Sequence, residues 1–458
     1  GKHSLAFAVP VMSDSHQSVS PRLEKLLKRR QRFMGKAYRL FYEQPLHVVS
    51  GEGVWLYDSD GNKYLDVYNN VPHVGHCHPQ VVEAICKQAQ TLNTHTRYLH
   101  GLVLEYAERL TSKLPDKLDK AMFACSGTEA NELALRLARA STGARGMIVT
   151  DHAYHGTSWA IAQITTCYKT SEKRGDNIVT VPTPDGFRGL YADDTLAADK
   201  YAEHLHSAIE TLAQRGHRPA AFIVDTIFSN EGLPTVPAGY LKKAVDIVRK
   251  AGGLFVADEV QPGFGRLGTH FWGFDSHGVT PDIATMGKPM GNGYPISALV
   301  TSADVIESFQ RNSHYFNTFG GTPVACAAAL AVLDIIEKQD LQARALETGN
   351  YLKDGLKELA ENNHIIGDIR GTGMFLGIDL VRDQDTREPA TQETKKAVNL
   401  LRHQGVLIGS TGQFDNVLKI RPPMVFSKDH ADLLLQKLVI VLQSLSDEAR
   451  SKPGHPLP

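Results

Sequence analysis

Short apolar runs alternate with helix-period patterns through the middle of this chain. Apolar runs of strand length occupy residues 120–124, 146–150, 220–225, 254–258 and 296–301. Between them, residues 130–140 and 240–251 repeat apolar positions at helical spacing. Strands that alternate with helices form a mainly parallel sheet with helices on both faces. We therefore predict a large α/β domain over residues 76–330.

The N-terminal part of the chain has a different pattern. After a polar arm, residues 22–42 have the composition of a basic helix, which Pro45 interrupts. Residues 51–66 read as a hairpin, with a polar turn at residues 58–62. We assign residues 1–75 to an N-terminal arm and to part of a smaller α+β domain.

The C-terminal part supplies the rest of this smaller domain. Helical patterns cover residues 328–338 and 341–361, and short strands are expected at 373–380 and 418–420. We find no internal repeat and no long low-complexity linker, and we assign residues 331–458 to the small domain.

Composition excludes several classes of function. The chain has 458 residues, 42% of them hydrophobic and 22% charged, and a net charge of -1. So little net charge gives no electrostatic attraction to nucleic acid or an anionic membrane, and no apolar run reaches the ~18 residues of a membrane helix. The five cysteines lie apart without a C-x-x-C pair, which argues against disulfides or zinc and for a reducing compartment. We expect a cytoplasmic protein without a bound metal.

The first candidate for chemistry is a lysine that follows a buried-strand carboxylate. Lys288 lies between glycine-rich segments, and 30 positions upstream the apolar run 254–257 ends in Asp258. A lysine among glycines is most often an ordinary loop residue. Together, however, the two residues meet the needs of pyridoxal phosphate: an amine holds the aldehyde as a Schiff base, and a carboxylate keeps the pyridine nitrogen protonated.

Two further segments follow strands and suit such a cofactor. Ser126, Gly127 and Thr128 begin a helical pattern, and the S-x-x-E spacing by itself predicts a capping box. The same turn offers backbone N–H groups, hydroxyls and a helix dipole to a phosphate. Tyr154 and His155, which follow the next strand, could cover one face of a pyridine ring or belong to the core.

These segments resemble the class III aminotransferases, a fold type I group of pyridoxal phosphate enzymes. The resemblance runs from about residue 35 to 445 and is carried by residues 258–293. Within the family, the chain is similar to the branch that holds ethanolamine-phosphate phospho-lyase and 5-phosphohydroxy-lysine phospho-lyase. The segments that carry this second likeness are residues 69–79, 123–131, 286–293 and 367–371.

The resemblance implies a role for each matching residue. Lys288 is the attachment lysine and proton shuttle, Asp258 pairs with the pyridine N–H, and Gln261 donates to the ring hydroxyl. The expected cofactor-binding residues are Ser126, Gly127, Thr128, Tyr154, His155, Asp225, Asp258, Gln261, Lys288 and Thr322. Because Thr322 is expected to reach the cofactor phosphate of a neighbouring subunit, the resemblance implies a homodimer with shared active sites.

The substrate side of the site is less sharply specified. Amide, basic and aromatic side chains suit an oxygen-rich substrate group, and the candidates are Arg39, Tyr42, Asn69, Asn70, His73, Arg97 and Arg421. In aminotransferases the arginine at position 421 binds the substrate carboxylate, but a guanidinium also accepts phosphate. The family usually has a glutamate where this chain has Asp225, which weakens the case for a two-substrate aminotransferase.

Both transamination and elimination use this machinery, so the substrate decides the reaction. We expect a pyridoxal phosphate-dependent phospho-lyase that converts a phosphorylated amino alcohol, such as O-phosphoethanolamine, to an aldehyde, ammonia and phosphate. The alternative is a class III aminotransferase of the ω-amino acid or alanine–glyoxylate type. A catalytically silent homologue is a third reading, against which the presence of both Lys288 and Asp258 argues.

Overall fold

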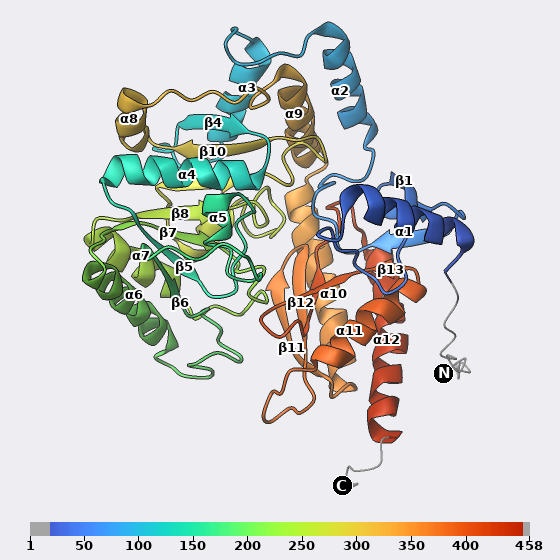
Figure 1. Cartoon of the computed structure of the whole chain (residues 1–458). Coiled ribbons are helices and arrows are strands. Elements are labelled where there is room, and N and C mark those ends of the chain that lie inside the picture. The colour runs from blue at the N-terminus through green and yellow to red at the C-terminus, as the bar shows by residue number, and fades with distance from the viewer. Residues whose placement is uncertain (1–18, 452–458) are drawn as a thin grey trace.

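The core of the protein is a mainly parallel, seven-stranded sheet, as the sequence predicts (Figure 1). The computed structural model describes residues 19–451, with side chains through residue 446. The strand order is β4-β10-β9-β8-β7-β5-β6, and β10 alone runs antiparallel to its neighbours β4 and β9. The strands are β4 (Lys120–Ala124), β5 (Gly146–Thr150), β6 (Ile178–Val181), β7 (Pro219–Asp225), β8 (Leu254–Asp258), β9 (Ile283–Met286) and β10 (Ser297–Thr301).

Helices cover both faces of this sheet. Along β7, Ala221 and Ile223 face one hydrophobic core while Phe222 and Val224 face the other, because successive strand side chains point to opposite faces. The first core includes residues of α4 (Gly127–Thr142), α5 (Trp159–Ala162) and α8 (Ala303–Asn312), and the second includes residues of α6 (Ala197–Gln214) and α7 (Tyr240–Lys250). A 3-10 turn, η1 (Gly273–His277), follows β8.

A second α+β unit packs beside the large sheet (Figure 1). Its antiparallel sheet has the order β11-β12-β15-β14, and α10 packs against α12 and β11. The strands are β11 (Ile366–Thr372), β12 (Phe375–Leu380), β14 (Gly409–Thr411) and β15 (Val417–Ile420). The helices are α10 (Leu341–Glu361), α11 (Thr391–His403) and α12 (Lys428–Ser451).

The N-terminal hairpin joins this unit rather than standing alone. Strands β1 (Val48–Glu52), β2 (Trp55–Asp58) and β3 (Lys63–Asp66) form a sheet to which the C-terminal β13 (Val406–Leu407) adds in parallel.

Helices α2 (Pro79–Thr91), α3 (Gly101–Thr111) and α9 (Pro323–Lys338) pack together at the other end of the molecule. The domain boundaries at residues 75 and 330 stay a prediction.

The first helix is shorter than predicted. α1 spans Pro21–Met34, whereas the sequence pattern suggested residues 22–42. Ser20 caps its start, and Gly35 ends it with a positive φ of 71°, a conformation that glycine adopts without strain. Most of the predicted polar arm, residues 1–18, lies outside the described residues. Among residues 19–451, no helix is both long and apolar enough to cross a membrane.

Candidate active site

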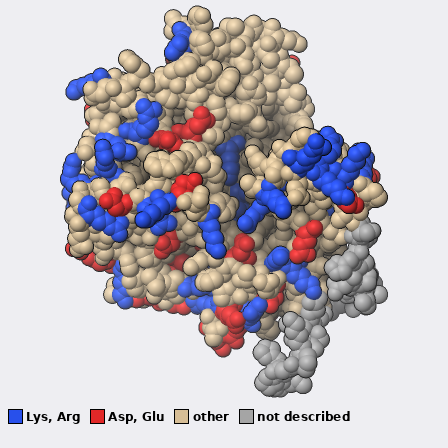
Figure 2. Space-filling view, viewed as in Figure 1, with Lys and Arg blue, Asp and Glu red and all other residues tan. Residues whose placement is uncertain are grey.

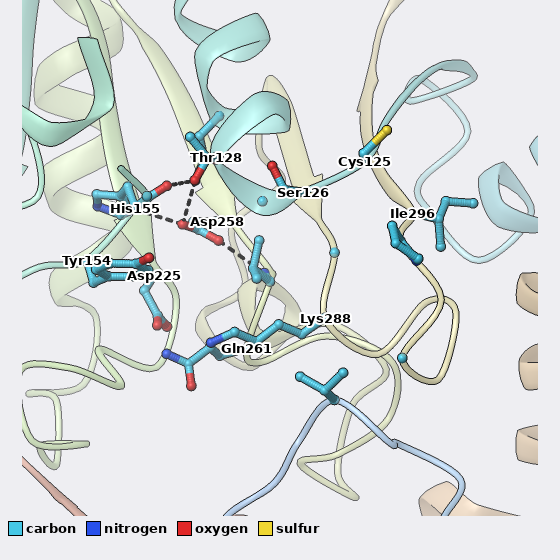
Figure 3. Close-up of a pocket in the computed structure, with 18 of the residues that line it drawn as sticks. Cys125, Ser126, Thr128, Tyr154, His155, Asp225, Asp258, Gln261, Lys288 and Ile296 are labelled. Carbon is cyan, nitrogen blue, oxygen red and sulfur yellow. Dashed lines mark hydrogen bonds and ion pairs between the residues drawn. The ribbon is translucent and has the colours of Figure 1, made fainter. Parts of the chain in front are cut away.

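Strand ends and helix starts from the large sheet converge on one cavity of about 300 Å³ (Figure 3). Asp225 and Asp258 lie opposite each other at the carboxyl ends of β7 and β8, where ligands bind in open α/β sheets. Nine of the residues singled out from the sequence line the cavity: Ser126, Gly127, Thr128, Tyr154, His155, Asp225, Asp258, Gln261 and Lys288.

The N-terminus of α4 forms one wall and is built for close approach of a ligand. The Ser126 hydroxyl accepts from the backbone N–H of Glu129 at 3.2 Å, as predicted for a capping box, but the Glu129 carboxylate accepts from the backbone N–H of Cys125 at 3.0 Å rather than from that of Ser126. A Cβ at Gly127 would lie 3.1 Å from Cγ2 of Val260, and one at Gly156 would lie 2.3 Å from Oγ1 of Thr128. The first intrahelical bond is made by Ala130, and the N–H groups of Gly127 and Thr128 make no hydrogen bond in the described part of the chain, so these two can bind an anion.

Asp258 is held in place by three donors. Nδ1 of His155 lies 2.7 Å from its Oδ2, and Asn131 donates to the same oxygen at 3.0 Å. The backbone N–H of Val260 donates to Oδ1 at 3.0 Å. Asn131 is fixed in turn by the Thr285 hydroxyl, which donates to its amide oxygen at 2.6 Å. This positioning role of Asn131 was not predicted from the sequence, where the residue is one more polar position on a helix.

Lys288 enters the cavity from the loop that follows β9, and its side chain reaches toward Gln261 and Asp225 (Figure 3). Burial and the nearby Arg421 charge lower the pKa of its amine to about 7, against the opposing effect of Asp258 and Asp225. At neutral pH a large share of the amine is therefore unprotonated and able to attack an aldehyde or remove a proton.

This lowered pKa leads to a prediction about cofactor capture. Because only the neutral amine attacks an aldehyde, the rate at which the apoenzyme binds pyridoxal phosphate covalently should rise with pH and level off above about pH 7. An exposed lysine, with a pKa of about 10.4, would keep gaining about tenfold per pH unit. Stopped-flow absorbance measures the rate, and a simple alkylamine measured in parallel corrects for titration of the aldehyde. A rate that still climbs steeply well above neutrality would contradict the burial of Lys288.

Two further buried carboxyl groups, Asp225 and Glu231, lie close enough together for their charges to interact. Asp225 accepts from the backbone N–H groups of Ile227 and Ser229 at 3.0 and 3.3 Å, and burial together with the Asp258 charge raises its pKa to about 6. Glu231 accepts from the Thr150 hydroxyl at 2.6 Å, and burial raises its pKa well above the usual range. Asp258 and Asp225 are the two carboxyl groups whose negative charges act on Lys288 and raise the pKa of its amine.

On another side of the cavity, hydrogen bonds connect the large sheet to the small domain. Arg421 donates to Oε1 of Gln261 and, at 2.9 Å, to the backbone oxygen of Tyr68. The amide of Asn70 donates to the same Gln261 oxygen at 3.4 Å. Gln261 therefore joins two predicted substrate residues to the cavity lining, and all three side chains are buried.

Five of the predicted residues take other positions in this chain. Arg39 and Arg97 are exposed, with Arg97 stacked on the ring of Phe316 at 4.0 Å. The Tyr42 hydroxyl donates to the backbone oxygen of Ile408 at 3.1 Å. The Asn69 amide oxygen accepts from the backbone N–H of Val71, two residues later, at 3.2 Å. His73 is wholly buried, 2.8 Å from the backbone oxygen of Phe264.

The environments of His73 and Thr322 show what these two residues do locally. Burial and the charge of Arg266 lower the pKa of His73 to about 3, so it is a neutral core residue and supplies no positive charge. Thr322 is buried at the start of α9 and does not line the cavity. The structure thus leaves the predicted role of Thr322 toward a neighbouring subunit as a prediction.

The cavity fits pyridoxal phosphate. It contains a buried amine with a lowered pKa, a fixed carboxylate, and a helix N-terminus with two tightly packed glycine positions. In addition, Nε2 of His155 is buried without a hydrogen-bond partner among the described residues. Ser126, Gly127 and Thr128 would hold the phosphate, Asp258 the pyridine nitrogen and Lys288 the aldehyde carbon.

Comparison with known proteins agrees with this fit. The model of the family described as aminotransferase class III matches residues 40–442. A Drosophila melanogaster protein named alanine–glyoxylate aminotransferase 2-like is 42% identical over 420 residues, which cover 89% of this chain and 85% of that protein. A Caenorhabditis elegans protein named ethanolamine-phosphate phospho-lyase homolog 1 is 39% identical over 424 residues, covering 89% of this chain and 91% of its own length.

Among solved structures, a phospholyase from Arthrobacter in complex with phosphoethanolamine superimposes with a TM-score of 0.89. It is 46% identical, and the match covers 92% of this chain and 99% of that one. These matches confirm both the family resemblance and the fold type that the sequence motifs indicated. The chain belongs to the class III aminotransferases, and it is an enzyme of that family with pyridoxal phosphate as its cofactor.

Proposed function

We propose that this enzyme is a phospho-lyase that eliminates phosphate from a phosphorylated amino alcohol such as O-phosphoethanolamine. The observation that carries the proposal is the separation of Asp225 from Arg421. Asp225 is bonded to its own loop, and no ion pair joins it to Arg421 among the described residues. The recorded partners of Arg421 are uncharged, so no carboxylate has to leave it before an anionic substrate binds. A two-substrate aminotransferase, by contrast, needs a carboxylate that covers this arginine in one half-reaction and releases it in the other.

The protein groups then have defined tasks. Bound pyridoxal phosphate supplies the electron sink. The neutral amine of Lys288 removes a proton from the carbon that bears the substrate nitrogen. The Asp258 carboxylate would lie beside the pyridine nitrogen of the cofactor and keep it protonated. The electron pair expels phosphate from the adjacent carbon. In sum, phosphoethanolamine and one water give acetaldehyde, ammonia and phosphate, with no net oxidation and therefore no need for an amino acceptor.

The second candidate is an aminotransferase of the ω-amino acid or alanine–glyoxylate type. Arg421 supports it, because a buried guanidinium also binds a carboxylate in two-point fashion. The name of the Drosophila relative points the same way. The two candidates differ in one requirement, since only the aminotransferase needs a keto acid to turn over.

Phosphate release separates the two. We expect the holoenzyme, given phosphoethanolamine and no keto acid, to release phosphate and acetaldehyde in equal amounts over many turnovers. Ethanolamine, which lacks the leaving group, should give no aldehyde and serves as the matched control. If phosphate stays at the background level while alanine and a keto acid support turnover, the enzyme is an aminotransferase.

We also infer that the active chain is a homodimer. Four large apolar side chains, Tyr98, Leu99, Phe316 and Phe319, are exposed, Leu99 by 97%. The stacking of Arg97 on Phe316 brings their two segments together, and Thr322 begins the helix that follows. A patch of this kind is typical of a protein interface. The cytoplasmic location stays a prediction.

A further inference from the structure

Two buried cations lie side by side at the edge of the active site: Lys419 is within strand β15, and Arg421 is the residue directly after this strand. Lys419 and Arg421 are two residues apart in extended chain, so their side chains leave the same face. They are 6% and 3% exposed. Both approach the ring of Tyr68, with Nζ of Lys419 at 5.4 Å and Cζ of Arg421 at 4.3 Å from its centre. Arg421 also bonds to Gln261, which lines the cavity.

Neither cation has an acidic partner within the described part of the chain. The bonds of Arg421 go to an amide and a backbone oxygen, and the Lys419 ammonium makes no hydrogen bond or ion pair there. The two carboxylates whose charges act on Lys419 are engaged elsewhere: Asp415 accepts from Ser410 at 2.9 Å, and Asp225 accepts from its own loop.

The same small sheet shows how this protein treats a buried cation with a structural role. Arg370 on β11 is 2% exposed, and it pairs with Asp379 at 2.6 Å and Asp368 at 3.0 Å. A buried charge without a partner is strongly unfavourable. Lys419, unlike Arg370, has no carboxylate partner in the described part of the chain, as expected of a group whose partner is a ligand.

We propose that Lys419 determines specificity for a dianion, forming with Arg421 the subsite that binds the phosphate of the substrate. This rests on the proposed phospho-lyase function and names the residue that separates a phosphate from a carboxylate. One guanidinium neutralises a carboxylate, whereas a phosphate dianion requires a second positive charge. Burial and the charges of Arg421 and Lys288 lower the pKa of Lys419, and an arriving dianion would reverse that effect. Figure 2 shows basic side chains inside and around the hollow on this face of the molecule.

The test uses the holoenzyme, so that the cofactor phosphate, which we expect at the start of α4, does not leave that site open to added phosphate. Lys419→Met removes the charge at similar length, Lys419→Arg keeps it, and Lys428→Met changes an exposed lysine of the same domain. Inorganic phosphate is titrated against the visible absorbance of the bound cofactor and as an inhibitor of phosphoethanolamine turnover. We expect the methionine variant to bind phosphate about 10- to 100-fold more weakly and its KM for phosphoethanolamine to rise more than kcat falls, with partial rescue by arginine.

The melting temperature, measured with and without added phosphate, is a second test of the proposal. If Lys419 is reserved for a ligand, the methionine variant should melt no lower than wild type without phosphate, because an uncompensated buried charge has been removed. It should also lose the stabilisation that added phosphate gives to wild type. A methionine variant that binds phosphate as wild type does, or that melts lower and still responds to phosphate, would overturn the proposal.

The outcomes also separate this inference from the proposed function. Phosphate release by wild type, together with unchanged phosphate binding in Lys419→Met, would retain the phospho-lyase and reject Lys419. Weakened phosphate binding in Lys419→Met, together with no phosphate release by wild type, would retain the anion subsite and reject the elimination.

Discussion

Lys288→Ala is expected to abolish turnover and to remove the visible absorbance of the covalently bound cofactor. Lys288 is the lysine among the residues that line the cavity, a lysine amine forms a Schiff base with an aldehyde, and its lowered pKa suits it to act as the general base as well. Loss of the proton-transfer role alone costs about 10²–10⁴-fold in rate, and loss of the attachment point adds to this. Absorbance spectra of the purified variant with added pyridoxal phosphate, and phosphate release from phosphoethanolamine, measure both effects.

Lys242→Ala is the matched control, because Lys242 lies exposed on α7 and its one ion pair within the described residues is with Asp246, four residues later. It should leave absorbance and activity unchanged. Circular dichroism should show the same helix content for both variants, since Lys288 makes no hydrogen bond or ion pair in the described residues. A Lys288→Ala enzyme that keeps the bound-cofactor absorbance and a measurable share of activity would place the chemistry on another residue.

Asp258→Asn is expected to retain the covalently bound cofactor but to slow turnover by about 10²–10³-fold, the usual effect of losing one placed electrostatic group. The asparagine side chain has the same shape but no charge, so it cannot keep the pyridine nitrogen protonated. Turnover is measured with phosphoethanolamine at saturating cofactor. Asp246→Asn on the exposed face of α7 is the control and should be neutral.

A cofactor analogue sharpens this second prediction. N-methylpyridoxal phosphate carries a permanent positive charge on the ring nitrogen and does not need the carboxylate to maintain it. The analogue should therefore recover part of the lost activity in Asp258→Asn. If the variant were slow because His155 and Asn131 had lost their common acceptor, the analogue would make no difference. That result would assign Asp258 a structural role in place of an electrostatic one.

Much of the cofactor site can be predicted from the sequence because each part is local. The Ser126 turn, the Tyr154–His155 segment and Asp258 each follow a strand directly, and the carboxyl ends of parallel strands meet at one edge of a sheet. The chain order of apolar runs therefore determines that these groups gather. The capping spacing at Ser126 and the lysine among glycines at Lys288 add their chemistry without any long-range contact.

The substrate side could not be predicted in this way. A polar residue near a motif has no local signal for whether it faces a ligand or the core, and His73 proved to be a buried neutral histidine while Arg39 is exposed. Helix α1 likewise ends at Met34, because Gly35 takes a positive φ.

The sequence by itself predicts the cofactor and points to Lys288 and Asp258 as its lysine and carboxylate, because those groups are positioned by strands and turns a few residues away. Only the tertiary structure decided how the small domain completes the site. It joins β13 to the N-terminal β3, bonds Arg421 to Gln261, 160 residues away, and buries Lys419 without an acidic partner. Whether a buried charge has a partner depends on groups that are distant in the chain, so folding alone determines it.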